Sequence, residues 1–224
     1  AIYIYVFVVL TLLLGCGRLS PDQNSTVEKR SISQENADYF KSVAFGAEYG
    51  DQLQGIIKWE SSPRIKIFGS PSSDDLATID TVISDIQLLT QDRLSIHITE
   101  SVHYDLAVYF VPKEEFGRYV QLPERHINGF LQLRIQNYRI KKGIILIASD
   151  IPQSLRHHVS REELTQSLGL LNDSWDYSNS IFYQGFSVTT EYSAADKDII
   201  SLLYSDEIYS GMPETELAQY INIY

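Results

Sequence analysis

The chain has 224 residues, and its 18 Lys and Arg against 29 Asp and Glu give a formal net charge of −11 at pH 7. A protein this acidic, with no basic run longer than two residues, cannot collect phosphates by counterion release, so we expect no nucleic-acid partner. Hydrophobic residues make up 44% and charged residues 21%, which is typical of a globular protein, and the length favours one domain with appendages.

Residues 1–15 are apolar and uncharged. They are too few to span a membrane, which takes about 20 helical residues, but they suit the apolar region of a secretory signal. The four residues from Leu13 to Cys16 (LLGC) resemble a bacterial lipobox, in which a small residue precedes a cysteine that is lipidated. We interpret residues 1–15 as an incomplete lipoprotein signal, because an initiator Met and a basic region are missing. A buried apolar strand with an incidental cysteine is the alternative.

Residues 16–36 predict a lipidated cysteine followed by a tether. From Gly17 to Asn36 the sequence is polar, lacks aromatic residues and shows no periodicity. A flexible coil of about 20 residues spans about 25 Å, enough to hold a domain clear of lipid headgroups. We therefore expect an exported lipoprotein of the cell envelope, held to a membrane through Cys16 and facing the periplasm or the exterior. Cys16 is the only cysteine, so no disulfide is expected.

The first half of the predicted domain, residues 37–224, alternates helices and strands. Residues 37–47 suit a short helix. The strongest helix signal follows Ser73, which can cap a first turn containing Asp74 and Asp75, with apolar residues at helical spacing up to Leu89. β-branched and aromatic residues indicate strands over residues 56–59, 64–68, 93–98 and 106–111.

The second half continues with both kinds of element. We expect a short helix after Pro112, a half-exposed strand over residues 130–135, a strand buried on both faces over residues 143–148 and a helix over residues 154–168. Further helices are indicated where Ser193 can cap a turn containing Asp196, and near Pro213. This order predicts an α+β domain with helices on one side of a mixed sheet.

The helix over residues 154–168 carries the polar residues that could do chemistry. On a helix Glu162 and Gln166 lie one turn apart on the same face, and Glu163 lies beside them. Gly169 then reverses the chain, so that Asn172 or Asp173 can return to the same place. Leu164 and Leu168 point the opposite way, toward a core.

This stretch resembles the active-site helix of matrixin-like zinc peptidases, whose pattern is HExxHxLGLxH. In that alignment Glu162 stands in the slot of the first histidine, Glu163 in that of the catalytic glutamate, Gln166 in that of the second histidine and Asn172 in that of the third. Residues 180–182 (SIF) fall where those enzymes place a Met-containing turn.

Together with residues 202–212 (LLYSDEIYSGM), the same features make the chain similar, over roughly residues 45–212, to the bacterial lipoprotein family catalogued as domain of unknown function 2927. The resemblance implies an exported protein with a zincin-like fold, an active-site-like helix and an altered metal motif. It implies no established activity.

The substituted residues decide which chemistry the resemblance allows. Hydrolytic zinc prefers imidazole and thiolate ligands, whereas Glu162, Gln166 and Asn172 offer one carboxylate and two amides, a set better suited to a hard cation. Without a metal to activate water, Glu163 has no water to deprotonate. We therefore expect no zinc, no cofactor and no ordinary peptidase activity.

His158 is the nearest replacement ligand, since His158, Glu162 and Gln166 form a stripe along one helix face. A histidine beside a glutamate is more often a surface ion pair. Two further interpretations need no ligand. The carboxylates either lie on a solvated face beside Arg161, or join Gln166, Asn172 and Arg161 in a structural network.

Three hypotheses remain for the function. We favour a non-catalytic binding or envelope protein whose groove beside the 143–148 strand binds a peptide or envelope partner. The second is a hydrolase in which Glu162, Gln166 and Asn172 or Asp173 hold a non-zinc cation and Glu163 acts as general base. The third is an envelope scaffold without a functional groove.

Overall fold

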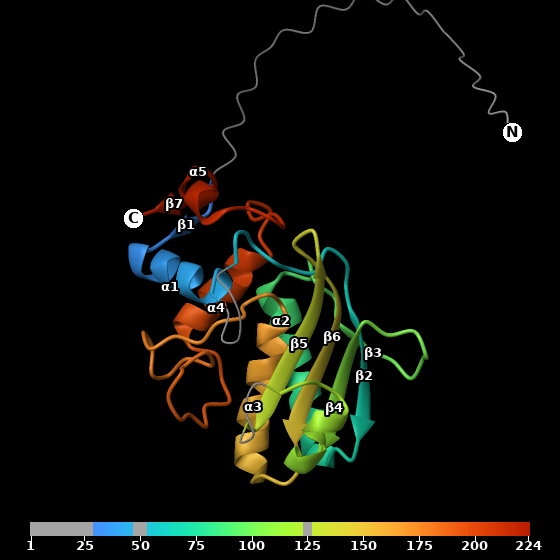
Figure 1. The fold of residues 1–224 in the computed structure, drawn as a ribbon. Coiled ribbons are helices and arrows are strands. Elements are labelled where there is room, and N and C mark those ends of the chain that lie inside the picture. Colours follow the sequence, from blue (N-terminus) through green and yellow to red (C-terminus); the bar gives the residue numbers. More distant parts are fainter. Residues whose placement is uncertain (1–28, 47–52, 123–126) are drawn as a thin grey trace, which may run out of the picture.

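The computed structural model describes residues 29–46, 53–122 and 127–224 (Figure 1). A five-stranded sheet with strand order β3-β2-β4-β6-β5 forms its centre, and a pair of short strands, β1 and β7, lies apart from it. The strands are β1 (Ser31–Ile32), β2 (Arg64–Gly69), β3 (His97–Ile98), β4 (Leu106–Val111), β5 (Gly129–Gln136), β6 (Arg139–Ala148) and β7 (Asn222–Ile223).

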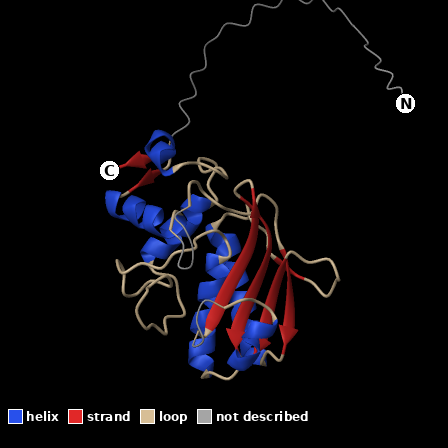
Figure 2. Cartoon of the chain, viewed as in Figure 1, coloured by secondary structure: helices blue, strands red, loops and turns tan. Residues whose placement is uncertain are grey.

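Most of the α-helices lie behind the sheet or to its left in the view of Figure 2, and two 3₁₀ turns complete the helical elements. They are α1 (Gln34–Ala44), α2 (Ser73–Leu89), η1 (Lys113–Arg118), α3 (Gln153–Gln166), α4 (Ala194–Leu203), η2 (Glu214–Glu216) and α5 (Leu217–Tyr220). No helix in the described ranges is long and apolar enough to cross a membrane. The predicted α+β class, with a mixed sheet, a helix near residues 154–168 and C-terminal helices, is confirmed.

The strand order puts β5 at one edge of the sheet. β2 pairs in parallel with β3 and β4, and β4 pairs in parallel with β6. In the described part of the chain β5 pairs only with β6, and the two strands are antiparallel. The apolar runs of β4 and β6 suit their central places, because a strand with neighbours on both sides has little exposed surface.

The helices bury their apolar faces against this sheet and against each other. α2 and α3 pack side by side, and α3 also contacts β5 and β6. α1 and α4 pack together beyond the end of α3, at the upper left of Figure 1. One continuous core therefore joins the sheet to both helix pairs.

Capping residues fix where two of the helices begin. The hydroxyl of Ser193 accepts the backbone N–H of Asp196, whose carboxylate accepts the N–H of Ser193, as the sequence predicts for α4. For α2 the prediction is wrong by one residue. The cap is Ser72, reciprocally bonded to Asp75.

Three other predictions need correction. Residues 56–59 form no strand, because only Lys58 makes a bridge, to Arg139. Residues 93–98 are a strand only at His97–Ile98. Residues 31–36, predicted to belong to a tether, are part of the folded domain, since Ser31–Ile32 pairs in parallel with Asn222–Ile223 and α1 begins at Gln34. The predicted signal segment and Cys16 lie outside the described residues.

Candidate functional site

A cavity of about 740 Å³ lies between the edge strand β5, helix α3 and the loop that follows α3. Its volume is within the range of small-molecule and peptide pockets. One wall comes from residues 129–133 and Ile135 of β5, and the opposite wall comes from one face of α3. The lining includes Gly129, Leu131, Leu133, Leu155, His158, Val159, Glu162, Glu163, Gln166, Asp173 and Phe186.

Helix α3 turns two different faces to its surroundings. Leu164 and Leu168, the latter just past its end, are buried in the core, as predicted. Glu162 and Gln166 line the cavity together with His158. Glu163 is only 7% exposed, so the interpretation of these carboxylates as a solvated helix face is wrong for Glu163.

His158 is buried rather than part of a surface ion pair, with only 5% of its surface exposed. Its Nδ1 lies 2.7 Å from the carbonyl oxygen of Thr189, so Nδ1–H donates there. Nε2 then carries the lone pair, and it lies 3.6 Å from Oε2 of Glu162. Burial lowers the pKa of His158, which keeps the ring neutral at pH 7.

The third position of the motif falls on Asp173 and not on Asn172. The amide nitrogen of Gln166 donates to Oδ1 of Asp173 over 2.9 Å, and both residues line the cavity. Asn172 does not line it. Its amide nitrogen donates to the carbonyl oxygen of Ser42, and its side chain packs against Gly46. Of the predicted pair, only Asp173 returns to Gln166.

Glu163 packs against the start of β5. A side chain on Gly129 would overlap Oε1 of Glu163, so the glycine allows the carboxyl group to approach the strand. Gly129 also lines the cavity. No local pattern predicts this contact, because the two residues are 34 positions apart and belong to different elements.

Arg161 does not join the predicted carboxylate network. Its Nη1 donates to Oδ2 of Asp85 over 2.7 Å, and its guanidinium lies over the ring of Tyr192. Together with His157 it lines a second cavity, of about 660 Å³, on the other side of α3. The two faces of the helix therefore serve separate cavities.

The residues in the histidine slots do not fit zinc. Zinc sites of hydrolases bring three ligands to one point, with imidazole nitrogen preferred. Here the amide nitrogen of Gln166 donates to Asp173, and Asn172 is turned toward α1. No group of three or more His, Cys, Asp or Glu within the described residues is placed to hold a metal ion. The ligand set of the hydrolase hypothesis, with Asn172 in it, is not assembled.

The predicted position of the groove is wrong by one strand. The 143–148 segment belongs to β6, which has β4 on one side and β5 on the other. β5 is the strand beside the cavity. A fully apolar run is typical of a central strand, whereas the alternating pattern of residues 130–135 already indicated a strand with an exposed side.

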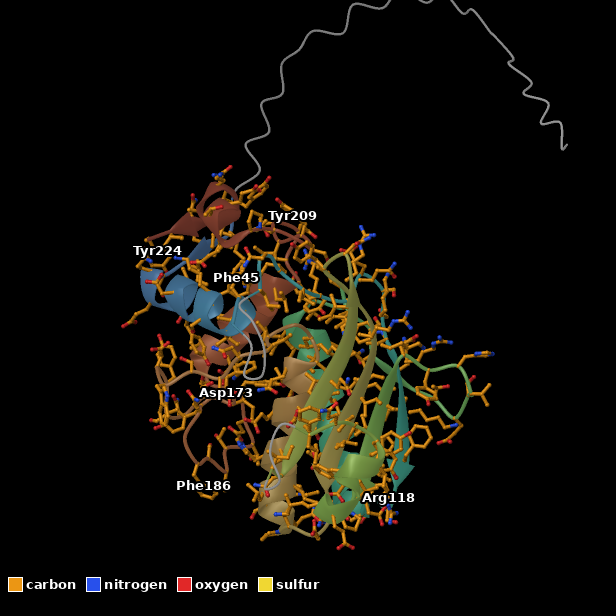
Figure 3. The ribbon with its side chains drawn as sticks, viewed as in Figure 1. Phe45, Arg118, Asp173, Phe186, Tyr209 and Tyr224 are labelled. Atoms are coloured by element: carbon orange, nitrogen blue, oxygen red, sulfur yellow. The ribbon has the colours of Figure 1, made fainter. Side chains whose placement is uncertain are left out.

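The loop after α3 supplies an apolar rim that the sequence analysis missed. Phe186 is 85% exposed and Trp175 is 65% exposed. Phe186 projects from the loop to the left of α3, below Asp173 (Figure 3), and it lines the cavity. The exposure of a single Phe in a long loop has no sequence signal.

The same loop is held in place by hydrogen bonds to a buried carboxylate. Asp196 is fully buried and accepts hydrogen bonds from the hydroxyl of Ser180 and the backbone N–H of Ile181, over 2.7 and 3.1 Å. The Tyr39 hydroxyl in α1 and the Ser193 N–H also donate to it. Residues 180–182, predicted to lie where related enzymes place a Met-containing turn, are thus fixed to α1 and α4.

Comparison with known proteins gives the family of the chain and solved structures that resemble its fold. A family model described as "Protein of unknown function (DUF2927)" matches residues 33–223, and no curated protein matches the chain. Two solved structures, titled "Crystal structure of myroilysin" and "Structure of Myroilysin", are 10% and 13% identical to the chain, with TM-scores of 0.43 and 0.42. They cover 79% and 80% of this chain and 98% of their own. At this identity the likeness concerns the fold alone.

Proposed function

This chain belongs to the family described as protein of unknown function (DUF2927), and from the cavity beside β5 we propose that it is a non-catalytic peptide-binding protein. The observation that carries the proposal is an edge strand, with a single partner strand among the described residues, running along a cavity of ligand size. An edge strand binds extended peptides by backbone hydrogen bonds, and adjacent pockets select their side chains.

The geometry of β5 sets the length of peptide that fits. The register with β6 is regular from Gly129 to Arg134 and shifts between Arg134 and Ile135. Such an irregularity commonly ends the usable edge of a strand. The regular part extends for about 17–20 Å, which corresponds to five or six extended residues of a bound peptide.

The walls of the cavity suit an extended chain with mixed side chains. Leu131 and Leu133 of β5 face Leu155 and Val159 of α3, with Phe186 at the rim. Burial of one apolar side chain between these walls contributes about 1.5–3 kcal/mol to binding. Absence of hydrolysis follows from the substituted motif, since Gln166 and Asn172 are engaged in other hydrogen bonds.

The experiment is binding of a synthetic library of extended octapeptides to the purified chain, without added metal and with zinc or calcium. We expect binders that are recovered intact under all three conditions. In the best binder, N-methylation of alternate residues should weaken affinity at least tenfold, because those N–H groups face β5, and methylation of the intervening residues should not. Cleavage, or insensitivity to N-methylation at every position, would contradict the proposal.

We infer further that the domain is held to a membrane of the bacterial cell envelope by lipidated Cys16. The inference is supported by the apolar segment before Cys16 and by the single cysteine of the chain. Labelling of the full chain in bacteria with an alkyne fatty acid tests it. We expect a labelled wild type and an unlabelled Cys16→Ser variant, and equal labelling of the two would contradict it.

A further inference from the structure

We propose that the second cavity, which lies between α2, α3 and the start of α4, binds a small zwitterion of the amino acid or dipeptide class with an apolar side chain. Arg161 and Lys197 bind the carboxylate of this ligand, Glu191 binds its ammonium group, and Leu88 and Leu89 contact its side chain. All five residues line the cavity. The site lies on the opposite side of α3 from the cavity beside β5, and it is independent of the proposed function.

The size of the cavity suits a ligand of this class. Its volume of about 660 Å³ is in the range of small-molecule pockets. Along one side the cavity follows α2, whose lining residues recur at helical spacing from Asp74 to Leu89. With a rise of about 1.5 Å per residue, this stretch of helix is about 22 Å long. The cavity is therefore long enough for a free amino acid or a dipeptide.

Arg161 is a buried cation whose position is fixed by its neighbours. Only 5% of its surface is exposed, its Nη1 donates to Oδ2 of Asp85 over 2.7 Å, and its guanidinium carbon lies 4.4 Å from the centre of the Tyr192 ring. A guanidinium carries five N–H donors, and Asp85 and Tyr192 are the side-chain partners of Arg161 within the described residues. N–H groups therefore remain for a carboxylate, which a guanidinium binds more strongly than a neutral acceptor.

Lys197 and Glu191 add opposite charges to the same lining. Both are exposed, and neither makes a side-chain hydrogen bond or ion pair within the described residues. Glu191 directly precedes Tyr192, on whose ring Arg161 lies, so a carboxylate stands close to the cationic end of the cavity. Groups of opposite charge in one cavity are the complement of an ammonium and a carboxylate on one small molecule. Asp74 also lines the cavity, so a ligand with several negative charges is disfavoured.

The end of the cavity next to Asp85 is apolar. Leu88 follows Asp85 by one turn of α2 and is 78% exposed, and Leu89 beside it is half-buried. A large apolar side chain that covers Leu88 removes apolar surface of both partners from water. This contact favours leucine over glycine or an acidic amino acid as the ligand.

Isothermal titration calorimetry of the purified chain with leucine and with the dipeptide leucyl-leucine tests the site, and the two probes distinguish a free amino acid from a short peptide. We expect at least one of them to bind. The form of the tighter probe that lacks the ammonium group and the form that lacks the carboxylate should each bind at least tenfold more weakly, because each loses one of the two charge contacts.

Variants of the lining test the assigned residues. Lys197→Gln and Glu191→Gln change exposed side chains, so we expect both chains to fold, and each should weaken binding of the tighter probe at least threefold. Arg161→Gln should weaken it at least tenfold. The matched control is Arg93→Gln, because Arg93 also pairs with an aspartate, Asp206, but is exposed and lies outside the cavity. This control should keep the full affinity.

Failure of both probes to bind the wild type at about 10 mM would overturn the site. Equal binding of the form without the ammonium group, or unchanged affinity in both Lys197→Gln and Glu191→Gln, would also overturn it. Binding of octapeptides beside β5 is measured separately. Loss of the zwitterion site therefore leaves the peptide-binding proposal standing, and failure of the octapeptides leaves this site standing.

Discussion

At the scale of single residues, the site depends on side chains whose partners could not be read from their spacing. The stripe of His158, Glu162 and Gln166 was predicted correctly, because a helix places residues four apart on one face. The burial of His158 was not predicted, since the ring is hydrogen-bonded to Thr189, a loop residue 31 positions away. The choice of Asp173 over Asn172 is likewise decided by tertiary packing of Asn172 on α1.

Burial of His158 makes stability depend on pH. Burial lowers its pKa in the folded state below the ordinary value of 6.5, so between these two values the unfolded chain binds more protons than the folded one. The stability that the neutral His158 contributes is fully present above pH 6.5. It is lost as the pH falls through the lowered pKa of the folded state. Glu162 is the ionisable group that faces the ring, at 3.6 Å.

We therefore expect the free energy of unfolding to fall between pH 7 and pH 5, and to fall less in a His158→Gln variant. Urea titrations of both proteins at the two pH values measure the difference. An equal or larger fall in the variant would contradict a buried neutral histidine.

At the scale of helices and strands, local sequence predicted most elements, and long-range pairing decided the others. The capping residues around α4 and the apolar runs of β4 and β6 were sufficient signals. Residues 56–59 have strand composition but find no partner beyond the bridge at Lys58. β1 and β7 were missed, because two residues are too few for a periodic signal.

The buried cap of α4 gives a prediction at this scale. Asp196 holds together α1, α4 and the segment around Ser180 with hydrogen bonds to both carboxylate oxygens. In Asp196→Asn an NH₂ group replaces one carboxylate oxygen, and an NH₂ group cannot accept the hydrogen bonds that this oxygen accepts. We therefore expect the free energy of unfolding to fall by about 2–4 kcal/mol.

Asp198→Asn is the control on the same helix, since Asp198 is exposed and its carboxylate accepts a hydrogen bond from the amide nitrogen of Asn36. It should change the free energy of unfolding by less than about 0.5 kcal/mol. Guanidinium denaturation measures both variants, and similar losses in the two would show that the Asp196 network does not hold these elements together.

At the scale of the whole molecule, the proposed binding site depends on how the edge strand and the loop after α3 are held in place. The edge of β5 is fixed by its pairing with β6, and the loop that carries Phe186 is fixed by Asp196 and its partners. The α+β class followed from the order of elements in the sequence, but which strand lies at the edge depends on strand order, which local patterns do not reveal.

The central claim is that a peptide pairs with β5, and amide hydrogen exchange of the chain with and without the best octapeptide tests it most directly. We expect the peptide to slow exchange within residues 129–134, which form the regular part of β5, and to leave β3 at the opposite edge of the sheet unchanged. Unchanged exchange in β5 at saturating peptide, with slowing confined to another part of the chain, would contradict the account.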